Sequence, residues 1–108
     1  MSAIFSLSTP RGRSGVAVVR VSGSSAFLAL ERFGISSLRG CGPDCRWIFD
    51  PETGDPIDQA LILKFVGPAS YTGEDTVEFQ LHGSTAVVDV VLEVLSRTEG
   101  FRFAEPGE

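Results

Sequence analysis

Arg20 is the first residue whose position in the sequence suggests chemistry. It lies in an apolar stretch, residues 15–22, where valines occupy both alternating sets of positions. Such a stretch predicts a strand in the middle of a sheet, buried on both faces. A guanidinium in that setting is costly unless an anion pairs with it. Either a carboxylate of the same chain or water at the strand end satisfies Arg20, or the anion belongs to a ligand, which the planar fork of arginine binds in bidentate fashion.

Glu78 is the second candidate, because residues 76–82 alternate strictly between polar and apolar side chains. This alternation predicts a strand with one apolar face and one row of hydrogen-bonding groups. The row consists of Thr76, Glu78, Gln80 and His82. It forms either a solvated face or the wall of a pocket. In a pocket, the carboxylate of Glu78 could accept two parallel N–H bonds from an amino-pyrimidine edge, such as that of a pterin.

A glycine- and proline-rich segment, residues 67–75, precedes this strand and predicts a loop. It contains Tyr71, Thr72 and Gly73, of which the tyrosine ring could stack on a flat ligand. The other interpretation is a tight turn with capping groups. The neighbouring carboxylates of Glu74 and Asp75 could chelate a hard cation such as Mg²⁺, but adjacent acids are common on surfaces, so we predict no metal site.

The remaining reactive residue types do not form a catalytic set. His82 is the only histidine, so any Ser/His/Asp catalytic set would have to include it. A lone histidine is more often structural than catalytic. The basic loop 11–15 lacks the Gly-Lys-Ser or Gly-Lys-Thr ending of a phosphate loop, and that ending is absent from the whole sequence. Cys41 and Cys45 supply two thiolates, whereas a closed zinc site needs four ligands. We therefore predict no catalytic residues in this chain.

Composition and charge limit the partners of the chain. It has 108 residues, of which 43% are hydrophobic, so we expect one domain with one core. The net charge is -5 and Lys64 is the only lysine. We therefore do not expect this segment alone to bind nucleic acid through its phosphates. Two cysteines are too few for a secreted disulfide scaffold. No apolar run approaches the roughly 18 residues that a membrane span requires.

The elements that must position these residues follow from hydrophobic period and turn formers. We predict strands at 3–8, 15–22, 46–49, 57–66, 76–82 and 101–104, and helices at 26–33 and 85–97. Ser24 or Ser25 caps the first helix, Gly34 ends it, and Ser84 caps the second. The order β-β-α-β-β-β-α-β mixes a hairpin with helical crossovers, which favours an α+β fold with a mixed β-sheet and two to three helices.

The second predicted helix is apolar around most of its circumference. Valines and leucines fill most positions from 87 to 95, and Glu93 and Arg97 form an i,i+4 pair on a thin polar stripe. Such a helix is buried on more than one side. It packs either wholly within this domain, or partly against another domain or a second copy of the chain.

Five segments, in this order, carry a resemblance to a known family. They are Thr-Pro-Arg-Gly-Arg-Ser-Gly at 9–15, Arg-Val-Ser-Gly at 20–23, Gly-Pro-Ala-Ser-Tyr-Thr-Gly-Glu-Asp at 67–75, Glu-Phe-Gln-Leu-His-Gly at 78–83, and Ala-Glu-Pro-Gly-Glu at 104–108. Together they resemble the N-terminal domain of the tRNA modification GTPases called MnmE or TrmE in bacteria, with mitochondrial counterparts. The resemblance covers nearly the whole chain, and its most specific part is the block from Tyr71 to Gly83.

The resemblance implies a fold, a ligand and partners. It implies that residues 1–108 are a single folate-binding and dimerisation domain, similar to the tetrahydrofolate-binding domain of aminomethyltransferases and separated from its helical and GTPase domains. The implied ligand is 5-formyltetrahydrofolate or a related one-carbon tetrahydrofolate. The implied contacts are Arg20 and Glu78, with Tyr71, Thr72 and Gly73 as further positions.

For the full-length enzyme, the resemblance implies GTP hydrolysis with Mg²⁺ and K⁺. It also implies an FAD-dependent partner of the GidA type, with which the enzyme installs an aminomethyl-type group at C5 of wobble uridine 34 in tRNA. The fragment alone is expected to be inactive. The resemblance also implies that the domain forms a homodimer, and that tRNA is met through the full complex rather than through this fragment. The implied location is the cytoplasm of a bacterium or the mitochondrial matrix of a eukaryote. Two alternatives stay open: a self-association scaffold without ligand, and a fragment of a folate-dependent one-carbon transferase.

Overall fold

The computed structural model describes residues 2–8, 16–36, 43–67, 73–82 and 84–105, and contains six strands and two helices within them. The strands are β1 (Ala3–Leu7), β2 (Val16–Ser22), β3 (Asp44–Phe49), β4 (Pro56–Phe65), β5 (Thr76–His82) and β6 (Phe101–Phe103). The helices are α1 (Leu28–Arg32) and α2 (Thr85–Ser96). Their order along the chain confirms the predicted β-β-α-β-β-β-α-β arrangement.

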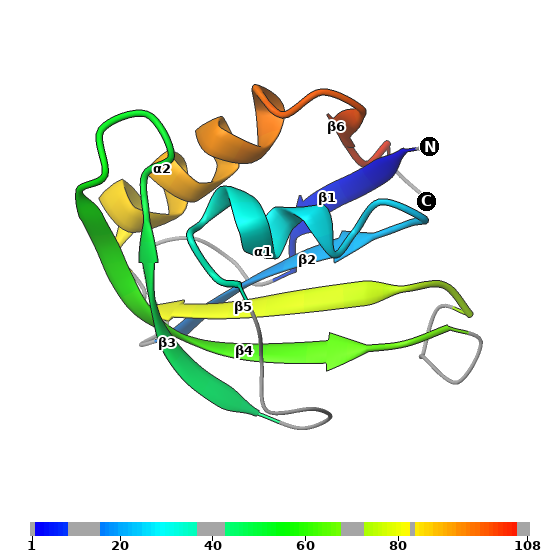
Figure 1. Cartoon of the computed structure of the whole chain (residues 1–108), viewed down its shortest axis with the longest axis horizontal. Coiled ribbons are helices and arrows are strands. Elements are labelled where there is room, and N and C mark those ends of the chain that lie inside the picture. The colour runs from blue at the N-terminus through cyan, green and yellow to red at the C-terminus, as the bar shows by residue number, and fades with distance from the viewer. Residues whose placement is uncertain (1, 9–15, 37–42, 68–72, 83, 106–108) are drawn as a thin grey trace.

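The strands form one mixed sheet in the order β3-β4-β5-β2-β1-β6 (Figure 1). Neighbouring strands are antiparallel except β1 and β6, which are parallel. The predicted hairpin of β3 and β4 is present, and its link is closed by hydrogen bonds from the Asp50 N–H to the Asp55 carbonyl and from the Gly54 N–H to the Asp50 carbonyl. Gly54 adopts a φ of 77°, a left-handed value that favours glycine. The mixed sheet and the two helices confirm the predicted α+β class.

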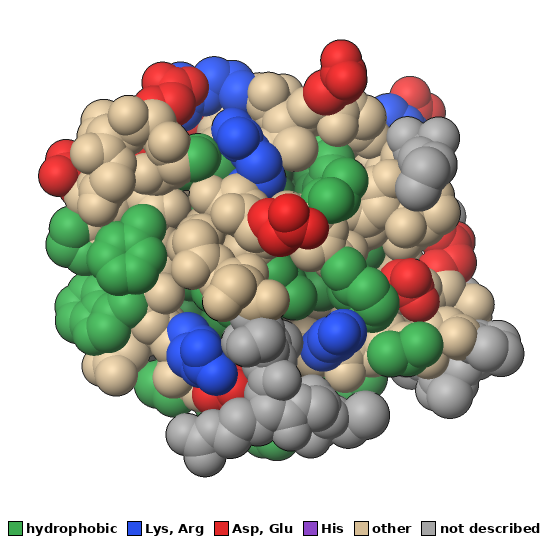
Figure 2. All heavy atoms as spheres, viewed as in Figure 1, with side chains coloured by type: hydrophobic (Ala, Val, Ile, Leu, Met, Phe, Trp, Pro, Cys, Tyr) green, Lys and Arg blue, Asp and Glu red, His purple; other side chains and the backbone are tan. Residues whose placement is uncertain are grey.

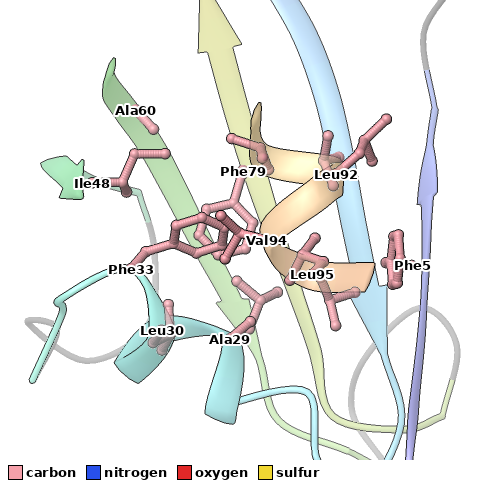
Figure 3. Packing of buried hydrophobic residues seen from close by; sticks show 14 of the residues in the cluster. Phe5, Ala29, Leu30, Phe33, Ile48, Ala60, Phe79, Leu92, Val94 and Leu95 are labelled. Carbon is pink, nitrogen blue, oxygen red and sulfur yellow. The ribbon is translucent and has the colours of Figure 1, made fainter. Parts of the chain in front are cut away.

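Both helices pack on the same face of the sheet, and the core lies between this face and the two helices (Figures 1 and 3). Figure 3 shows Phe33 next to α1 and Phe79 of β5 meeting at the centre of this core. Their ring centroids are 5.3 Å apart in an edge-on arrangement that aromatic pairs favour. Burying the apolar side chains of the whole core is the main stabilising contribution to the fold. It also fixes which way β5 presents its alternate residues.

The strand β2 departs from its prediction on one face. Ala17, Val19 and Val21 are fully buried, but Val18 is half-buried and Val16 is 47% exposed. The prediction that both faces of this strand are buried is therefore wrong. The strand does lie in the middle of the sheet, between β5 and β1, but the helices cover only one of its faces.

The start of the first helix also differs from the prediction. The residues before Leu28 form turns with i to i+3 hydrogen bonds, such as Ala26 N–H to the Gly23 carbonyl, so the α-helix itself is shorter than predicted. Neither Ser24 nor Ser25 caps it, because Phe27 holds the N-cap position and the Ser24 hydroxyl bonds to the Ser2 carbonyl instead. The predicted stop at Gly34 is confirmed by its φ of 84°.

The second helix packs mainly inside the domain. Val88, Val91 and Leu95 are buried against the sheet, whereas Val90 is 38% exposed. Ser84 occupies the N-cap position as predicted, but its side chain makes no capping hydrogen bond. Among the described residues, neither helix is long and apolar enough to cross a membrane.

Candidate functional site

Arg20 and Glu78 meet across two neighbouring strands. They are direct partners in the antiparallel register of β2 and β5. Arg20 Nη2 and Nε both donate to Glu78 Oε2, at 2.7 and 3.0 Å. The pair forms because Arg20 lies directly opposite Glu78 in this register, so that both side chains point to the same face of the sheet. Two residues that the sequence singled out separately thus form one site.

The Arg20–Glu78 ion pair is only partly exposed to solvent. The side chain of Arg20 is 36% exposed and that of Glu78 is 17% exposed. A carboxylate of the same chain therefore satisfies the guanidinium, which is one of the alternatives that the sequence left open. Both donors converge on Oε2, so Oε1 of Glu78 receives neither of these bonds. The site combines a fixed cation with a carboxylate oriented by it, an arrangement able to hold a ligand that donates N–H bonds.

The pair lies on the face of the sheet opposite the helices, which we call the outer face. Ser6 faces Arg20 on one side and Leu63 faces Glu78 on the other. The alternate positions of β2, β3, β4 and β5 supply the rest of this face: Val16, Val18, Cys45, Trp47, Gln59, Leu61, Gln80 and His82. Trp47 is 51% exposed and Val16 is 47% exposed. The described part of the outer face thus combines apolar and polar side chains around the Arg20–Glu78 ion pair.

The loop before β5 is described only in part. Tyr71 and Thr72, predicted as further ligand contacts, lie outside the described residues. Gly73 is described and adopts a φ of 81° just before β5, with open space around it. Asp75 closes this loop by accepting a hydrogen bond from the Gly67 N–H at 3.0 Å, so part of the acidic pair serves local structure.

A second polar pair, Asp58 and His82, was missed by the sequence reasoning. Asp58 is 9% exposed, and its Oδ1 lies 2.7 Å from His82 Nδ1. Its other oxygen accepts a hydrogen bond from the His82 backbone N–H at 2.9 Å. The signal in the sequence was an acid at an inward position of β4, in phase with the buried Ala60 and Ile62. A carboxylate at such a position requires hydrogen-bond partners.

Two cavities border these elements. One, of about 230 Å³, opens on the outer face beside His82, Gln80 and Gln59. The other, of about 360 Å³, lies between the β3–β4 link and α2, lined in part by Asp55 and Val90. Among the residues described, no group of three acidic, cysteine or histidine side chains could hold a metal ion. Cys45 is an exposed free thiol on the outer face, and Cys41 lies outside the described residues.

Comparison with known proteins gives a consistent result. Residues 3–108 match the family described as the N-terminus of the GTP-binding protein TrmE. The chain is 49% identical over 106 residues to the tRNA modification GTPase MnmE of Anaplasma marginale, covering 97% of this chain and 23% of that protein. It is 46% identical to the mitochondrial tRNA modification GTPase mss1 of Schizosaccharomyces pombe, covering 97% of this chain and 22% of that protein.

A human relative extends the comparison. The chain is 45% identical to the mitochondrial 5-taurinomethyluridine-[tRNA] synthase subunit GTPB3, over 97% of this chain and 22% of that protein. The chain thus spans between a fifth and a quarter of the length of the curated relatives it matches. Both bacterial and mitochondrial proteins are among them.

Proposed function

Because the chain belongs to the family of TrmE N-terminal domains of tRNA modification GTPases, we propose that it binds a one-carbon tetrahydrofolate and forms a homodimer. The bound species is 5-formyltetrahydrofolate or a close relative. The observation that carries this proposal is the meeting of Arg20 and Glu78 on the outer face. Two residues proposed for folate contact from sequence alone occupy one place in the fold.

The chemistry of the pair suits a pterin. The amino-pyrimidine edge of this ring presents two N–H groups side by side, and a carboxylate accepts both. In the proposed complex, Glu78 accepts these bonds while Arg20 holds the carboxylate in place. The half-buried setting, with Glu78 at 17% exposure, strengthens such bonds relative to those in water.

The proposed dimer uses the apolar part of the outer face. Trp47 and Val16 are large exposed apolar residues there, and β4 adds the half-buried Leu61 and Leu63 to the same face. Contiguous apolar surface on a sheet favours association, and a two-fold dimer buries the same patch on both copies. A second copy on this face would also exclude water from the Arg20–Glu78 pair.

The charge distribution supports a limited role in contacting tRNA. In the view of Figure 2, the basic and acidic side chains of the described residues intermingle and form no large basic patch. The net charge of -5 points the same way. We propose that tRNA is met through the full-length complex, in which the GTPase domain uses GTP, Mg²⁺ and K⁺. There an FAD-dependent partner of the GidA type cooperates in placing an aminomethyl-type group at C5 of wobble uridine 34.

One observation favours a second candidate function, a self-association domain without ligand. Arg20 and Glu78 satisfy one another in the free chain, so neither requires a ligand for its own stability. Calorimetric titration with 5-formyltetrahydrofolate, with sedimentation run in parallel, separates the two functions. Heat of binding that disappears in both Arg20→Ala and Glu78→Ala supports the folate site. Dimers without any heat of binding would favour the scaffold, and unchanged affinity in both variants would defeat the site assignment.

A further inference from the structure

The link between β3 and β4 lies beside α2 on the helix side of the sheet (Figure 1). A cavity of about 360 Å³ separates the link from the helix, and we call it the α2 cavity. The apolar part of its wall consists of Pro56, Ile57, Ala86, Val87 and Val90. Val90 is 38% exposed, so this is the part of the apolar helix that the domain itself does not bury. The volume is at the lower end of the range of about 300–1,000 Å³ for ligand sites.

Hydrogen bonds hold the link in one shape. The Asp50 N–H donates to the Asp55 carbonyl at 2.9 Å, and the Gly54 N–H donates to the Asp50 carbonyl at 2.8 Å. The Glu52 N–H donates to Asp50 Oδ1 at 2.8 Å. Arg97, directly after α2, ties the link to the helix through an ion pair with Glu52 at 2.9 Å. A wall that is already ordered in this way reduces the entropy that a bound partner must lose.

The charges around the α2 cavity are mostly negative. Segments 50–57 and 85–97, which enclose it, contain five acids and one basic residue. That basic residue, Arg97, forms ion pairs with two of the acids, Glu52 and Glu93. Within the described part of the chain, neither carboxylate on the cavity wall pairs with this arginine. The cavity therefore combines an apolar interior with an acidic rim.

This combination determines which occupant fits. The two carboxylates on the wall, those of Asp50 and Asp55, repel the phosphates of nucleic acid. A second copy of the chain is also disfavoured, because a two-fold contact would bring two acidic rims together. An inorganic cation would gain nothing from the valines and the isoleucine. Charge complementarity thus favours a cationic partner that also carries an apolar side chain.

We propose that the α2 cavity docks a basic peptide segment of a partner protein, which inserts one apolar side chain between α2 and the link. The inserted side chain packs on Ile57 and Val90. Lysine or arginine side chains on either side of it meet Asp50 and Asp55 at the rim. This surface lies on the opposite side of the sheet from the proposed folate site and the proposed dimer contact, so the proposal does not depend on either.

The first test titrates the unmodified chain in low-salt buffer with three synthetic pentapeptides, each capped at both ends. The basic peptide is Arg-Arg-Leu-Arg-Arg, and its controls are Arg-Arg-Ala-Arg-Arg and Glu-Glu-Leu-Glu-Glu. Nuclear magnetic resonance should show the largest shifts at Ile57, Val87 and Val90. We expect the leucine peptide to bind at least about fivefold more tightly than the alanine peptide, and the acidic peptide not to bind. Equal affinities of the two basic peptides, or no shifts in this cavity at millimolar peptide, would overturn the proposal.

The second test separates the charged rim from the apolar wall. Asp55→Asn should weaken both basic peptides at least about threefold, whereas Glu31→Gln, an exposed acid on α1, is the charge-matched control. Val90→Ala should weaken the leucine peptide and leave the alanine peptide unchanged. Val66→Ala, at a valine that is 50% exposed just after β4, is its control. Thermal unfolding checks that each variant folds. An Asp55→Asn effect equal to that of its control, or a Val90→Ala effect equal for both peptides, would contradict the proposal.

A competition experiment distinguishes a peptide site from a site for free polyamines. Spermidine carries several ammonium groups but no apolar side chain, so we expect it to displace the leucine peptide only weakly, by screening the rim. Displacement at concentrations equal to that of the peptide would assign the cavity to polyamines and overturn the proposal. Failure of this proposal is distinguishable from failure of the folate proposal, because 5-formyltetrahydrofolate is expected to perturb Arg20 and Glu78 on the outer face and the peptide is not.

Discussion

Replacing Glu78 with glutamine tests the folate site with the smallest change of shape. Glutamine is nearly isosteric with glutamate and keeps one oxygen acceptor. In the structure, Arg20 donates two hydrogen bonds to Oε2 of Glu78. In Glu78→Gln, the amide oxygen is expected to stay with Arg20, which turns the amide NH₂ group toward the position of the ligand. That group then opposes the N–H donors of the pterin edge.

The expected loss follows from the bonds that are removed. A hydrogen bond to a charged group contributes about 1.5–3 kcal/mol, so the affinity for 5-formyltetrahydrofolate should fall about ten- to hundredfold. The fold should lose far less. The Arg20 side chain is 36% exposed, and ion pairs at such exposure contribute about 1 kcal/mol or less. For a domain of this size, that corresponds to a decrease of no more than about 5 °C in melting temperature.

Calorimetry and thermal unfolding measure the two quantities on the same sample. Glu93→Gln serves as the control, because Glu93 is an exposed acid on α2 that makes an i,i+4 contact with Arg97 at 3.4 Å. Equal folate affinities of Glu78→Gln and the unmodified chain would refute the role given to the carboxylate. A large drop in melting temperature with unchanged affinity would show that the pair serves only the fold.

Three further changes probe the outer face, the core and the N-terminal strand. Trp47→Glu should weaken the dimer at least about tenfold in sedimentation while unfolding shifts by less than about 0.5 kcal/mol, because Trp47 is 51% exposed; an unchanged dimer would place the interface elsewhere. Phe79→Ala should lower the free energy of unfolding by about 3–5 kcal/mol in urea titration, since Phe79 is fully buried against Phe33, and a loss below about 1 kcal/mol would contradict this packing. Gly23→Ala should cost about 2 kcal/mol by the same assay, because Gly23 has a φ of 136° and a Cβ would lie 2.6 Å from the Ser2 carbonyl oxygen; a neutral effect would refute this strain.

The sequence predicted the elements well because each carries a local signal. Strict alternation marked β5, turn formers marked the β3–β4 hairpin, and a glycine marked the end of α1. These signals depend only on neighbours within a few residues. The first helix was predicted to start at residue 26, whereas it starts at Leu28. The Ser24 hydroxyl, which was expected to cap it, donates to the Ser2 carbonyl near the N-terminus instead.

The candidate site needed information that alternation does not contain. Periodicity assigned Arg20 and Glu78 each to a face of its own strand, but only the register of β2 and β5 makes them partners. The exposure of Val16 depends on both helices packing on the opposite face of the sheet. The Asp58–His82 contact joins residues 24 positions apart at the point where strand pairing stops, and no local pattern encodes it.

The central claim is that a one-carbon folate binds on the outer face at Arg20 and Glu78. The most direct measurement is amide chemical-shift mapping of the 108-residue chain during titration with 5-formyltetrahydrofolate. The account predicts that the largest shifts fall on β2 around Arg20 and on β5 around Glu78. Shifts confined to the cavity between the β3–β4 link and α2, or the absence of shifts at saturating folate, would contradict it.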